Sequence, residues 1–317
     1  MKKALGILAA LAVLVCGMTG AMAEPFRVGI CQLVTHDALD AATQGFMDAL
    51  TEELGADNVT FDVQNAAGDS NTCSTIVNSF VAEDVDLILA NATPALQAAT
   101  AATADIPILG TSVTEYGVAL NIQGFDGTVG GNVSGTSDLA PLDQQAAMIY
   151  ELFPDAETVG LIYCSAEANS QYQVDTVKAE LEKLGYTCEL YPFADSNDAA
   201  AVTQTACDAS DVIYLPTDNT VASNTGIVDN ICQPAGVPVV AGEEGIVKGC
   251  GVATLSISYY DLGVTTGKMA AQILTGEADI SSMPIAYAED FTPKYNPVIC
   301  EALGLTMPEN YVAIDME

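Results

Sequence analysis

The segment at residues 216–220, PTDNT, places a carboxylate, an amide and two hydroxyl groups directly after the apolar run at 212–215. Such groups are costly to bury without partners, so their position indicates either the start of a helix or a binding surface. Asp218 could pair with the ammonium group of a ligand, whereas Asn219 or Thr220 could cap the following helix. The chemistry available here is therefore ionic binding or helix capping.

Five other polar segments follow apolar runs in the same way. They are VTHDALD at 34–40, NATPAL at 91–96, GTSVTEY at 110–116, CSAEANS at 164–170 and GEEG at 242–245. At any one segment a helix cap or a turn is sufficient explanation, because Ser, Thr, Asn and Asp favour both. In open parallel sheets, however, ligands bind outside the carboxyl ends of the strands. Six polar strand ends together therefore predict a binding cleft.

Such a cleft could hold both charges of an amino acid. Asp218, Glu243 and Glu244 could pair with its ammonium group. Arg27, the one arginine beyond residue 23, begins the first apolar run and is expected to point away from the cleft. A ligand carboxylate would then lack an arginine clamp and would rely on hydroxyl groups and on backbone N–H groups at a helix start. Thr93, at the start of an expected helix, offers that arrangement.

Catalytic signals in the sequence are weak. Cys31 and His36 lie near one strand end and could be imagined as nucleophile and base, but Cys31 lies within the apolar run and no third partner is evident. The motifs G-x-S-x-G, G-x-x-x-x-G-K-[ST] and G-x-G-x-x-G are absent. We therefore predict that the protein is not an enzyme and has no catalytic residue and no cofactor. His36 and Tyr259 remain candidates to line the cleft.

The chain contains nine cysteines, of which Cys16 lies in the first 23 residues and eight lie beyond them. An even number permits disulfides in an exported chain, but the spacing does not determine their pairing. No pair has C-x-x-C spacing and His36 is the only histidine, so a zinc site would need four distant cysteines. We predict no metal site.

The net charge excludes one class of partner. Acidic residues outnumber Lys and Arg by 42 to 8, which gives a formal net charge of -34. Proteins bind phosphate backbones through Lys and Arg, so nucleic acid is excluded. The acidity is typical of a self-repelling, soluble surface, and we expect a monomer.

Apolar runs and helical patterns alternate along the chain in two series. In the first series, strands are expected at 26–34, 59–63, 85–90 and 106–113, with helices at 38–54, 72–81 and 94–103. In the second, strands are expected at 158–164, 187–193, 211–216 and 237–242, with helices at 141–152, 171–184, 198–209 and 220–231. Continuous apolar strands between helices are typical of parallel sheets covered on both faces. The expected fold class is therefore α/β, with two Rossmann-like lobes joined by crossings.

The expected bounds are 24–134 plus about 245–278 for lobe 1, and 135–244 plus about 279–317 for lobe 2. The glycine-rich segment at 124–138 lacks periodicity and is interpreted as the crossing between the lobes. A further strand and helix at 251–274 are expected to return the chain to lobe 1. We expect a last crossing near 276–283.

The first 23 residues have the pattern of a secretory signal. Two lysines precede an apolar stretch at 4–15, and Ala21-Met22-Ala23 forms a cleavage pattern, so we expect removal after Ala23. The alternative is a lipid anchor at Cys16, although Val15 is a poor residue to precede a lipidated cysteine. The apolar stretch is shorter than the roughly 20 residues that a spanning helix needs. We therefore expect an exported protein, periplasmic or associated with the cell surface.

Six segments closely resemble, in this order, motifs of one family. They are VTHDALDAATQGFMDAL at 34–50, DLILANATPALQAA at 86–99, GNVSGTSDLAPLDQQ at 131–145, GLIYCSAEANS at 160–170, IYLPTDNTVAS at 213–223 and SISYYDLGVTTGKMAAQIL at 256–274. The family is that of the ABC-transporter substrate-binding proteins associated with tryptophan and tyrosine uptake, which are type I periplasmic binding proteins. The resemblance covers roughly residues 26–275.

This resemblance implies a binding protein that closes two lobes on a free aromatic amino acid and delivers it to a permease driven by an ATPase. It also implies a set of ligand-facing residues, namely Thr35, His36, Thr93, Thr111, Thr114, Asn169, Ser170, Asp218, Asn219, Glu243 and Tyr259. Two departures put the aromatic specificity in question. Relatives commonly have Thr-Asp-Pro where this chain has Thr114-Glu115-Tyr116, and a Glu-His-Pro-like run where it has Thr35-His36-Asp37.

Other functions stay open at this point. A ligand-sensing module would share the two lobes but would lack a partner permease. A binder of a branched-chain amino acid, a sugar or a nucleoside is a further alternative. Sugar and nucleoside binders are expected to use more stacking aromatics and arginine than a chain with no tryptophan and one arginine beyond residue 23 provides.

Overall fold

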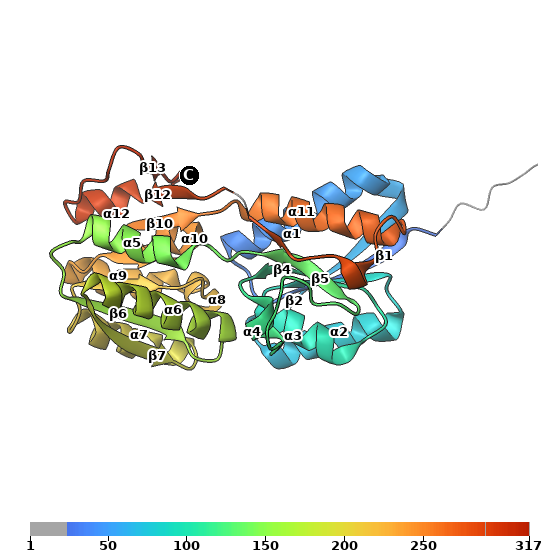
Figure 1. Cartoon of the computed structure of the whole chain (residues 1–317), viewed down its shortest axis with the longest axis horizontal. Helices are drawn as coiled ribbons and strands as arrows, with labels where there is room; N and C mark the ends of the chain where they lie inside the picture. Colours follow the sequence, from blue (N-terminus) through green and yellow to red (C-terminus); the bar gives the residue numbers. More distant parts are fainter. Residues whose placement is uncertain (1–23, 289, 317) are drawn as a thin grey trace, which may run out of the picture.

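The computed structural model describes residues 24–288 and 290–316, and the expected signal segment with Cys16 lies outside these ranges. The described chain forms two lobes, each with one sheet between layers of helices (Figure 1). Within these ranges, no helix is both long and apolar enough to cross a membrane.

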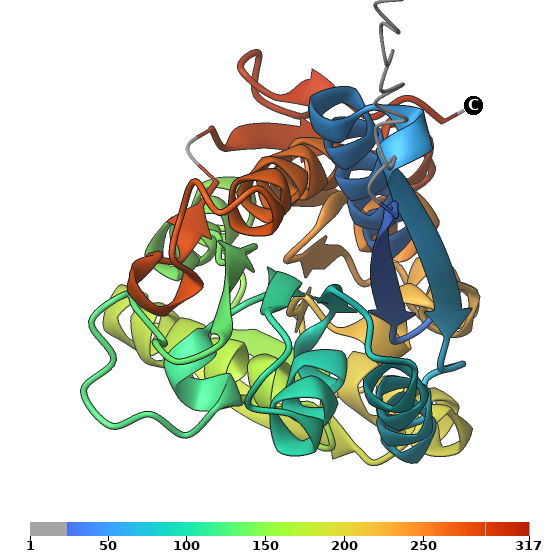
Figure 2. The ribbon, with the colours of Figure 1, turned by 90° about the vertical axis from the view of Figure 1, so that its right-hand side faces the viewer.

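Lobe 1 is built on a six-stranded sheet of parallel pairs in the order β11-β5-β4-β3-β1-β2. Its strands are β1 (Phe26–Gln32), β2 (Val59–Asn65), β3 (Leu87–Asn91), β4 (Ile108–Val113), β5 (Val133–Ser137) and β11 (Ala286–Tyr287). Its helices are α1 (Asp37–Leu54), α2 (Ser70–Glu83), α3 (Thr93–Ala102), α4 (Tyr116–Ala119) and α11 (Tyr259–Leu274), with 3-10 turns η1 (Ala56–Asn58) and η2 (Ile280–Ser282). Helices α1 and α11 cover one face and α2 and α3 the other (Figure 2), so an apolar core lies on each side of the sheet.

Lobe 2 is built on a seven-stranded sheet in the order β13-β12-β10-β9-β8-β6-β7, in which the pair β10 and β12 is antiparallel. Its strands are β6 (Thr158–Cys164), β7 (Thr187–Phe193), β8 (Val212–Leu215), β9 (Val239–Ala241), β10 (Ala253–Ser256), β12 (Thr292–Tyr295) and β13 (Val312–Ala313). Its helices are α5 (Leu142–Leu152), α6 (Ala168–Leu184), α7 (Ser196–Cys207), α8 (Asn219–Ala222), α9 (Thr225–Ala235), α10 (Glu244–Cys250) and α12 (Pro297–Ala302). One core lies under α5 and α6 and the other under α7, α9 and α10.

The chain passes between the lobes after β5, after β10 and after β11, and these positions correct the expected bounds. Strand β10 pairs with β9, so residues 245–256 belong to lobe 2, whereas we expected them in lobe 1. Of the strand and helix that we expected to return to lobe 1, only the helix, α11, does so. Strand β11 pairs with β5 in lobe 1, so the last crossing lies after Tyr287 rather than near 276–283. Apolar patterning indicates the type of an element but not the sheet that accepts it, and this explains the difference.

Helix α11 approaches α1 closely because glycine stands at the contact. A Cβ on Gly45 would lie 2.1 Å from the carbonyl oxygen of Tyr260, and a Cβ on Gly263 would lie 2.1 Å from that of Ala42. Neither approach is compatible with a side chain, since protein interiors have no room for such overlap. The close packing holds Tyr259, at the start of α11, against the first turn of α1.

Candidate functional site

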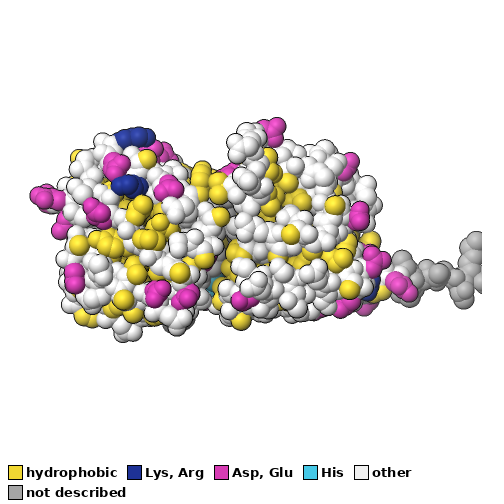
Figure 3. Space-filling view, turned by 90° about the horizontal axis from the view of Figure 1, so that it is seen from below, with side chains coloured by type: hydrophobic (Ala, Val, Ile, Leu, Met, Phe, Trp, Pro, Cys, Tyr) yellow, Lys and Arg dark blue, Asp and Glu magenta, His cyan; other side chains and the backbone are white. Residues whose placement is uncertain are grey.

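A groove separates the two lobes (Figure 3), and the loops that follow strands of both sheets meet across it. A narrow inner cavity lies there, between the two lobes. Its lining residues are His36, Leu39, Ser112, Thr114, Asp138, Asn169, Thr217, Asp218, Asn219, Ala222, Glu243 and Tyr259. Most of these residues follow strands of the two sheets or lie at the starts of helices, as expected for a ligand site in open parallel sheets.

The structure brings most of the residues expected at the site into this cavity. Those that line it are His36, Thr114, Asn169, Asp218, Asn219, Glu243 and Tyr259. Thr35 lines an adjoining hollow, where its hydroxyl group accepts a hydrogen bond from the Asn65 amide at 3.1 Å. Three further expected residues are buried and are not among the lining residues, namely Thr93, Thr111 and Ser170. The Thr111 hydroxyl accepts instead from Thr136, at 3.1 Å.

Four polar atoms of the cavity wall have no hydrogen-bond partner among the described residues. They are His36 Nδ1, Ser112 Oγ, Asp138 Oδ1 and Asn169 Oδ1. Buried polar groups in native proteins are almost always hydrogen-bonded, so such a concentration of exceptions in one cavity points to a bound partner. The atoms come from both sides of the groove, since His36 and Ser112 lie in lobe 1 and Asn169 in lobe 2.

Asp138 was not among the residues expected from the sequence, although it lies in one of the quoted motifs. It follows β5 at the first crossing and is only 4% exposed. Its Oδ2 accepts a hydrogen bond from the Tyr259 hydroxyl at 2.9 Å, whereas Oδ1 has no partner. Burial raises the pKa of Asp138, and the hydroxyl groups of Tyr259 and Thr114 oppose this effect. A carboxylate with a free, cavity-facing oxygen is suited to an ammonium group.

Asp218 proves to be the cap of the next helix, a role that we assigned to Asn219 or Thr220. Its Oδ1 accepts from the Val221 N–H at 2.9 Å and its Oδ2 from the Cys164 N–H at 2.7 Å. Both oxygens are thus occupied by the protein itself. Burial, together with the nearby Glu167, raises the pKa of Asp218 to about 7.

Glu243 is engaged in the same manner at the start of α10. Its carboxylate accepts from the N–H groups of Gly245 at 2.6 Å and Ile246 at 2.7 Å. Burial raises the pKa of Glu243 to about 7. Among the three acids that line the cavity, Asp138, Asp218 and Glu243, only Asp138 therefore keeps an unpartnered oxygen, and it is the best placed to receive an ammonium group.

Substitution of Asp218 by alanine is expected to destabilise the fold. The change leaves two buried N–H groups without an acceptor, and loss of a helix cap alone costs about 0.5–2 kcal/mol. Urea denaturation should show a lower free energy of unfolding than for Asp195→Ala, which removes an exposed cap from α7. An unchanged free energy of unfolding with weakened ligand binding would contradict the capping role and favour direct contact with the ligand.

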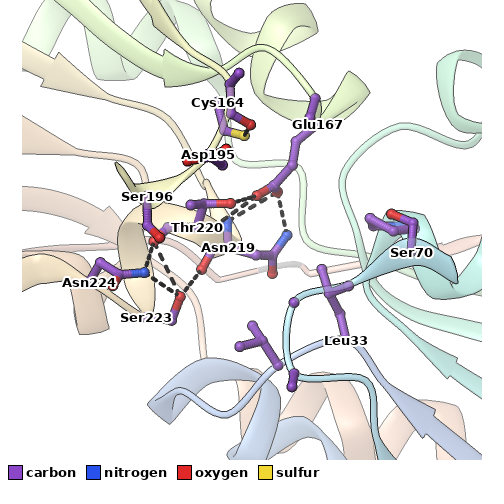
Figure 4. Close-up of a pocket in the computed structure, with 16 residues that line it drawn as sticks. Leu33, Ser70, Cys164, Glu167, Asp195, Ser196, Asn219, Thr220, Ser223 and Asn224 are labelled. Carbon is purple, nitrogen blue, oxygen red and sulfur yellow. Dashed lines mark hydrogen bonds between the residues drawn. The ribbon is translucent and has the colours of Figure 1, made fainter. Parts of the chain in front are cut away.

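Glu167 was also not among the residues expected at the site from the sequence. Its carboxylate links the segment before α6 to the start of α8 (Figure 4). Its Oε1 accepts from the N–H and the hydroxyl of Thr220 at 2.9 and 2.8 Å, and its Oε2 accepts from the Asn219 side-chain amide at 2.7 Å. This contact fixes the orientation of the Asn219 amide, because a carboxylate can only accept a hydrogen bond and the amide must therefore turn its nitrogen toward Glu167. The other end of the amide, Oδ1, lies 3.2 Å from His36 Nε2 across the groove.

His36 therefore joins the two lobes. Since the Asn219 oxygen is an acceptor, Nε2 donates to it, and Nδ1 is left as an acceptor with no partner. Burial lowers the pKa of His36, which favours this neutral form. The contact is made only when the lobes are close together, and it places a free acceptor in the cavity.

The departure at Tyr116 lies behind the cavity. The Tyr116 hydroxyl donates to the Thr136 carbonyl at 3.0 Å, and the side chain fills space beside Gly110 and Gly135, where a Cβ would lie 2.4 Å from that hydroxyl. Tyr116 is 1% exposed and does not line the cavity. It therefore supports β4 and β5, which end at the site.

A family model described as "ABC transporter substrate binding protein" matches residues 27–316. The chain belongs to this family. The family prediction is confirmed, and membership implies a small-molecule ligand, an ABC transporter as partner and a place outside the cytoplasm. In the described residues no cluster of His, Cys, Asp and Glu suited to a metal ion is found.

Three relatives of this substrate-binding protein bear on the site. A tyrosine-binding protein of Clostridioides difficile is 36% identical over 281 residues, covering 88% of this chain and 81% of the relative. A structure of an ABC domain from Streptococcus pneumoniae in complex with L-Trp is 35% identical, with a TM-score of 0.86 over 90% of this chain and 96% of the other. A ligand-free, open structure of a substrate-binding protein from Clostridium difficile is 38% identical, with a TM-score of 0.70 over 92% of this chain and 100% of the other.

These neighbours indicate which state the lobes adopt. At similar identity, the chain superposes better on the L-Trp complex than on the ligand-free, open structure. The lobe arrangement is thus closer to that of the ligand-bound neighbour, in accord with the contact between His36 and Asn219. A leucine-binding protein of Thermotoga maritima, 12% identical with a TM-score of 0.63 over 80% of this chain and 84% of the other, shares the fold. The predicted two-lobed fold is confirmed.

Proposed function

We propose that this chain binds a free aromatic amino acid in the interlobe cavity and presents it to the permease of an ABC importer. The observation that carries the proposal is the set of four unpartnered polar atoms around one closed cavity. The names of the tyrosine-binding relative and of the L-Trp complex support an aromatic amino acid over a sugar, a nucleoside or a branched-chain amino acid.

The two charges of the ligand would be held differently. Asp138 would receive the ammonium group through its free Oδ1. Arg27 is unsuited to the carboxylate, because its guanidinium donates to the carbonyl groups of Glu83 and Asp84 at 2.7 and 2.5 Å. The unpartnered Ser112 hydroxyl is the candidate donor. Ser112 has a φ of 53°, a conformation that costs energy in a non-glycine residue and is often retained at functional sites.

Closure would follow from contacts to both lobes. A ligand that bonds to Asp138 and Ser112 on one side and to Asn169 on the other stabilises the closed arrangement over the open one. In this proposal the chain is a monomer, performs no chemical conversion and is exported after cleavage behind Ala23.

A melting-temperature screen tests the proposal. L-tyrosine, L-tryptophan or L-phenylalanine at about 100 times its Kd should raise Tm by about 5 °C, because binding to the native state alone stabilises it. L-leucine, glucose and adenosine serve as controls from the alternative ligand classes. A shift with one of these controls and none with an aromatic amino acid would contradict the proposal.

A further inference from the structure

Two cysteines of lobe 2 face each other between adjacent helices. Cys207 ends α7 and Cys232 lies in α9, and these helices pack together on one face of the sheet. Their Sγ atoms lie 2.8 Å apart. Both side chains are buried, at 7% and 1% exposure, in the same apolar core. The fold thus brings together two thiols that are separated along the chain.

Other cysteines of lobe 2 have different surroundings. The thiols of Cys164, Cys250 and Cys300 donate to the backbone carbonyls of Ala194, Ile246 and Val252 at 3.5, 3.3 and 3.5 Å. Such a carbonyl contact is ordinary for a buried thiol. In lobe 1, Cys31 and Cys73 are hydrogen-bonded neighbours. Cys207 and Cys232 therefore differ from the single thiols of their lobe in having a sulfur as partner.

We propose that Cys207 and Cys232 form a structural disulfide in the exported protein. The Cys207 thiolate attacks one sulfur of a donor disulfide, such as that of a thiol–disulfide oxidoreductase, and expels one donor thiolate. The Cys232 thiolate then attacks the Cys207 sulfur of the mixed disulfide and expels the second donor thiolate. The pair loses two electrons to the donor, and the two protons from the cysteines end on the two donor thiols.

The compartment of the protein and the burial of the two cysteines agree with this step. Substrate-binding proteins work outside the cytoplasm, where disulfides form and persist. Because both sulfur atoms are buried in the folded chain, the exchange takes place before α7 and α9 are fully packed.

The disulfide would stabilise the segment that forms one wall of the ligand cavity. The loop that it closes, residues 207–232, contains β8 and the cavity residues Thr217, Asp218 and Asn219. Closing a loop restricts the unfolded chain and thereby stabilises the folded one. The inference does not rest on the identity of the ligand.

The pairing can be tested by peptide mapping. The protein is isolated from its extracytoplasmic compartment without reductant, denatured, alkylated, and cleaved after lysine and before aspartate. This places Cys207 in the segment 198–207 and Cys232 in the segment 229–248, each with no other cysteine. We expect the two segments to be linked and two hydrogen atoms lighter than their sum. Full alkylation of both cysteines, or a link from Cys232 to Cys250, would overturn the proposal.

Variants provide an independent measurement. Cys207→Ala, Cys232→Ala and the double variant should each lower Tm by about 5 °C, and dithiothreitol should lower the Tm of the unsubstituted protein, but not of the variants, by a similar amount. Cys188→Ala is the matched control, since Cys188 is also 7% exposed but lies beside Lys178, Glu182 and Glu189. Additive losses in the double variant together with no effect of reductant would overturn the proposal.

Discussion

Replacing Asp138 with asparagine is expected to weaken the binding of L-tyrosine about 100-fold, because removing one partner of a buried charge pair costs roughly 2–5 kcal/mol. Asparagine keeps the size of the side chain and an oxygen that can accept from Tyr259, but it removes the negative charge at the cavity. The effect should therefore fall on binding, with most of the fold retained. Isothermal titration calorimetry measures the change in Kd, and a thermal melt of the ligand-free variant checks the fold.

Asp211→Asn is the matched control for Asp138→Asn. Asp211 accepts hydrogen bonds from the N–H groups of Glu157 and Thr158, both at 2.9 Å, and does not line the cavity. Its substitution should leave the Kd unchanged. If Asp138→Asn binds L-tyrosine normally while Asp218→Asn does not, the ammonium group is held by Asp218, as the sequence suggested.

The contrast between Asp138 and Asp218 shows how far the sequence can predict a site. The alternation of apolar runs and helices predicts two parallel sheets, and the strand-end rule then predicts the location of the cavity. The sequence does not show which carboxylate already accepts hydrogen bonds from the protein itself. Asp218 is drawn into a helix cap by two N–H groups, whereas Asp138 keeps a free oxygen.

Other differences have similar physical causes. Asp138 lies at the end of a glycine-rich segment without periodicity, so no pattern marks it as the end of a strand. Thr93 follows β3 and Thr111 lies near the end of β4, yet both side chains are buried in the protein interior. Side-chain direction at a strand end depends on the local backbone, as the φ of 53° at Ser112 illustrates. A single sequence does not reveal this conformation.

The contacts at Glu167 prepare lobe 2 for its contact with lobe 1. Glu167 holds the Asn219 amide, and that amide reaches His36 of lobe 1. Opening the groove breaks only the last of these contacts, because Glu167 and Asn219 both belong to lobe 2. Lobe 2 therefore keeps a preformed acceptor for His36 in either state, and closure needs little rearrangement within the lobe.

The stability of the ligand-free protein is expected to fall by several kcal/mol as the pH rises from about 4 to about 8. Burial raises the pKa of Asp218 from 3.8 to about 7 and that of Glu243 from 4.5 to about 7. Between these values the folded state binds more protons than the unfolded state, so the free energy of unfolding decreases with pH. The stabilising contribution is complete below the unfolded-state pKa values and is lost as the pH passes the folded-state values near 7. Each pKa unit corresponds to about 1.4 kcal/mol.

Urea denaturation across this pH range measures the slope, and Glu243→Gln and Asp218→Asn should each reduce it, because an amide does not titrate. Glu301→Gln, at an exposed position of α12, is the control and should leave the slope unchanged. The raised pKa of Glu243 reflects a balance between burial, with Asp37 and Glu244 nearby, and the N–H groups of Gly245 and Ile246, which favour the ionised form. A stability that rises over this range would mean that the N–H groups outweigh burial. Both caps would then be held as carboxylates, and the ammonium group of the ligand would enter a cavity with a higher negative charge.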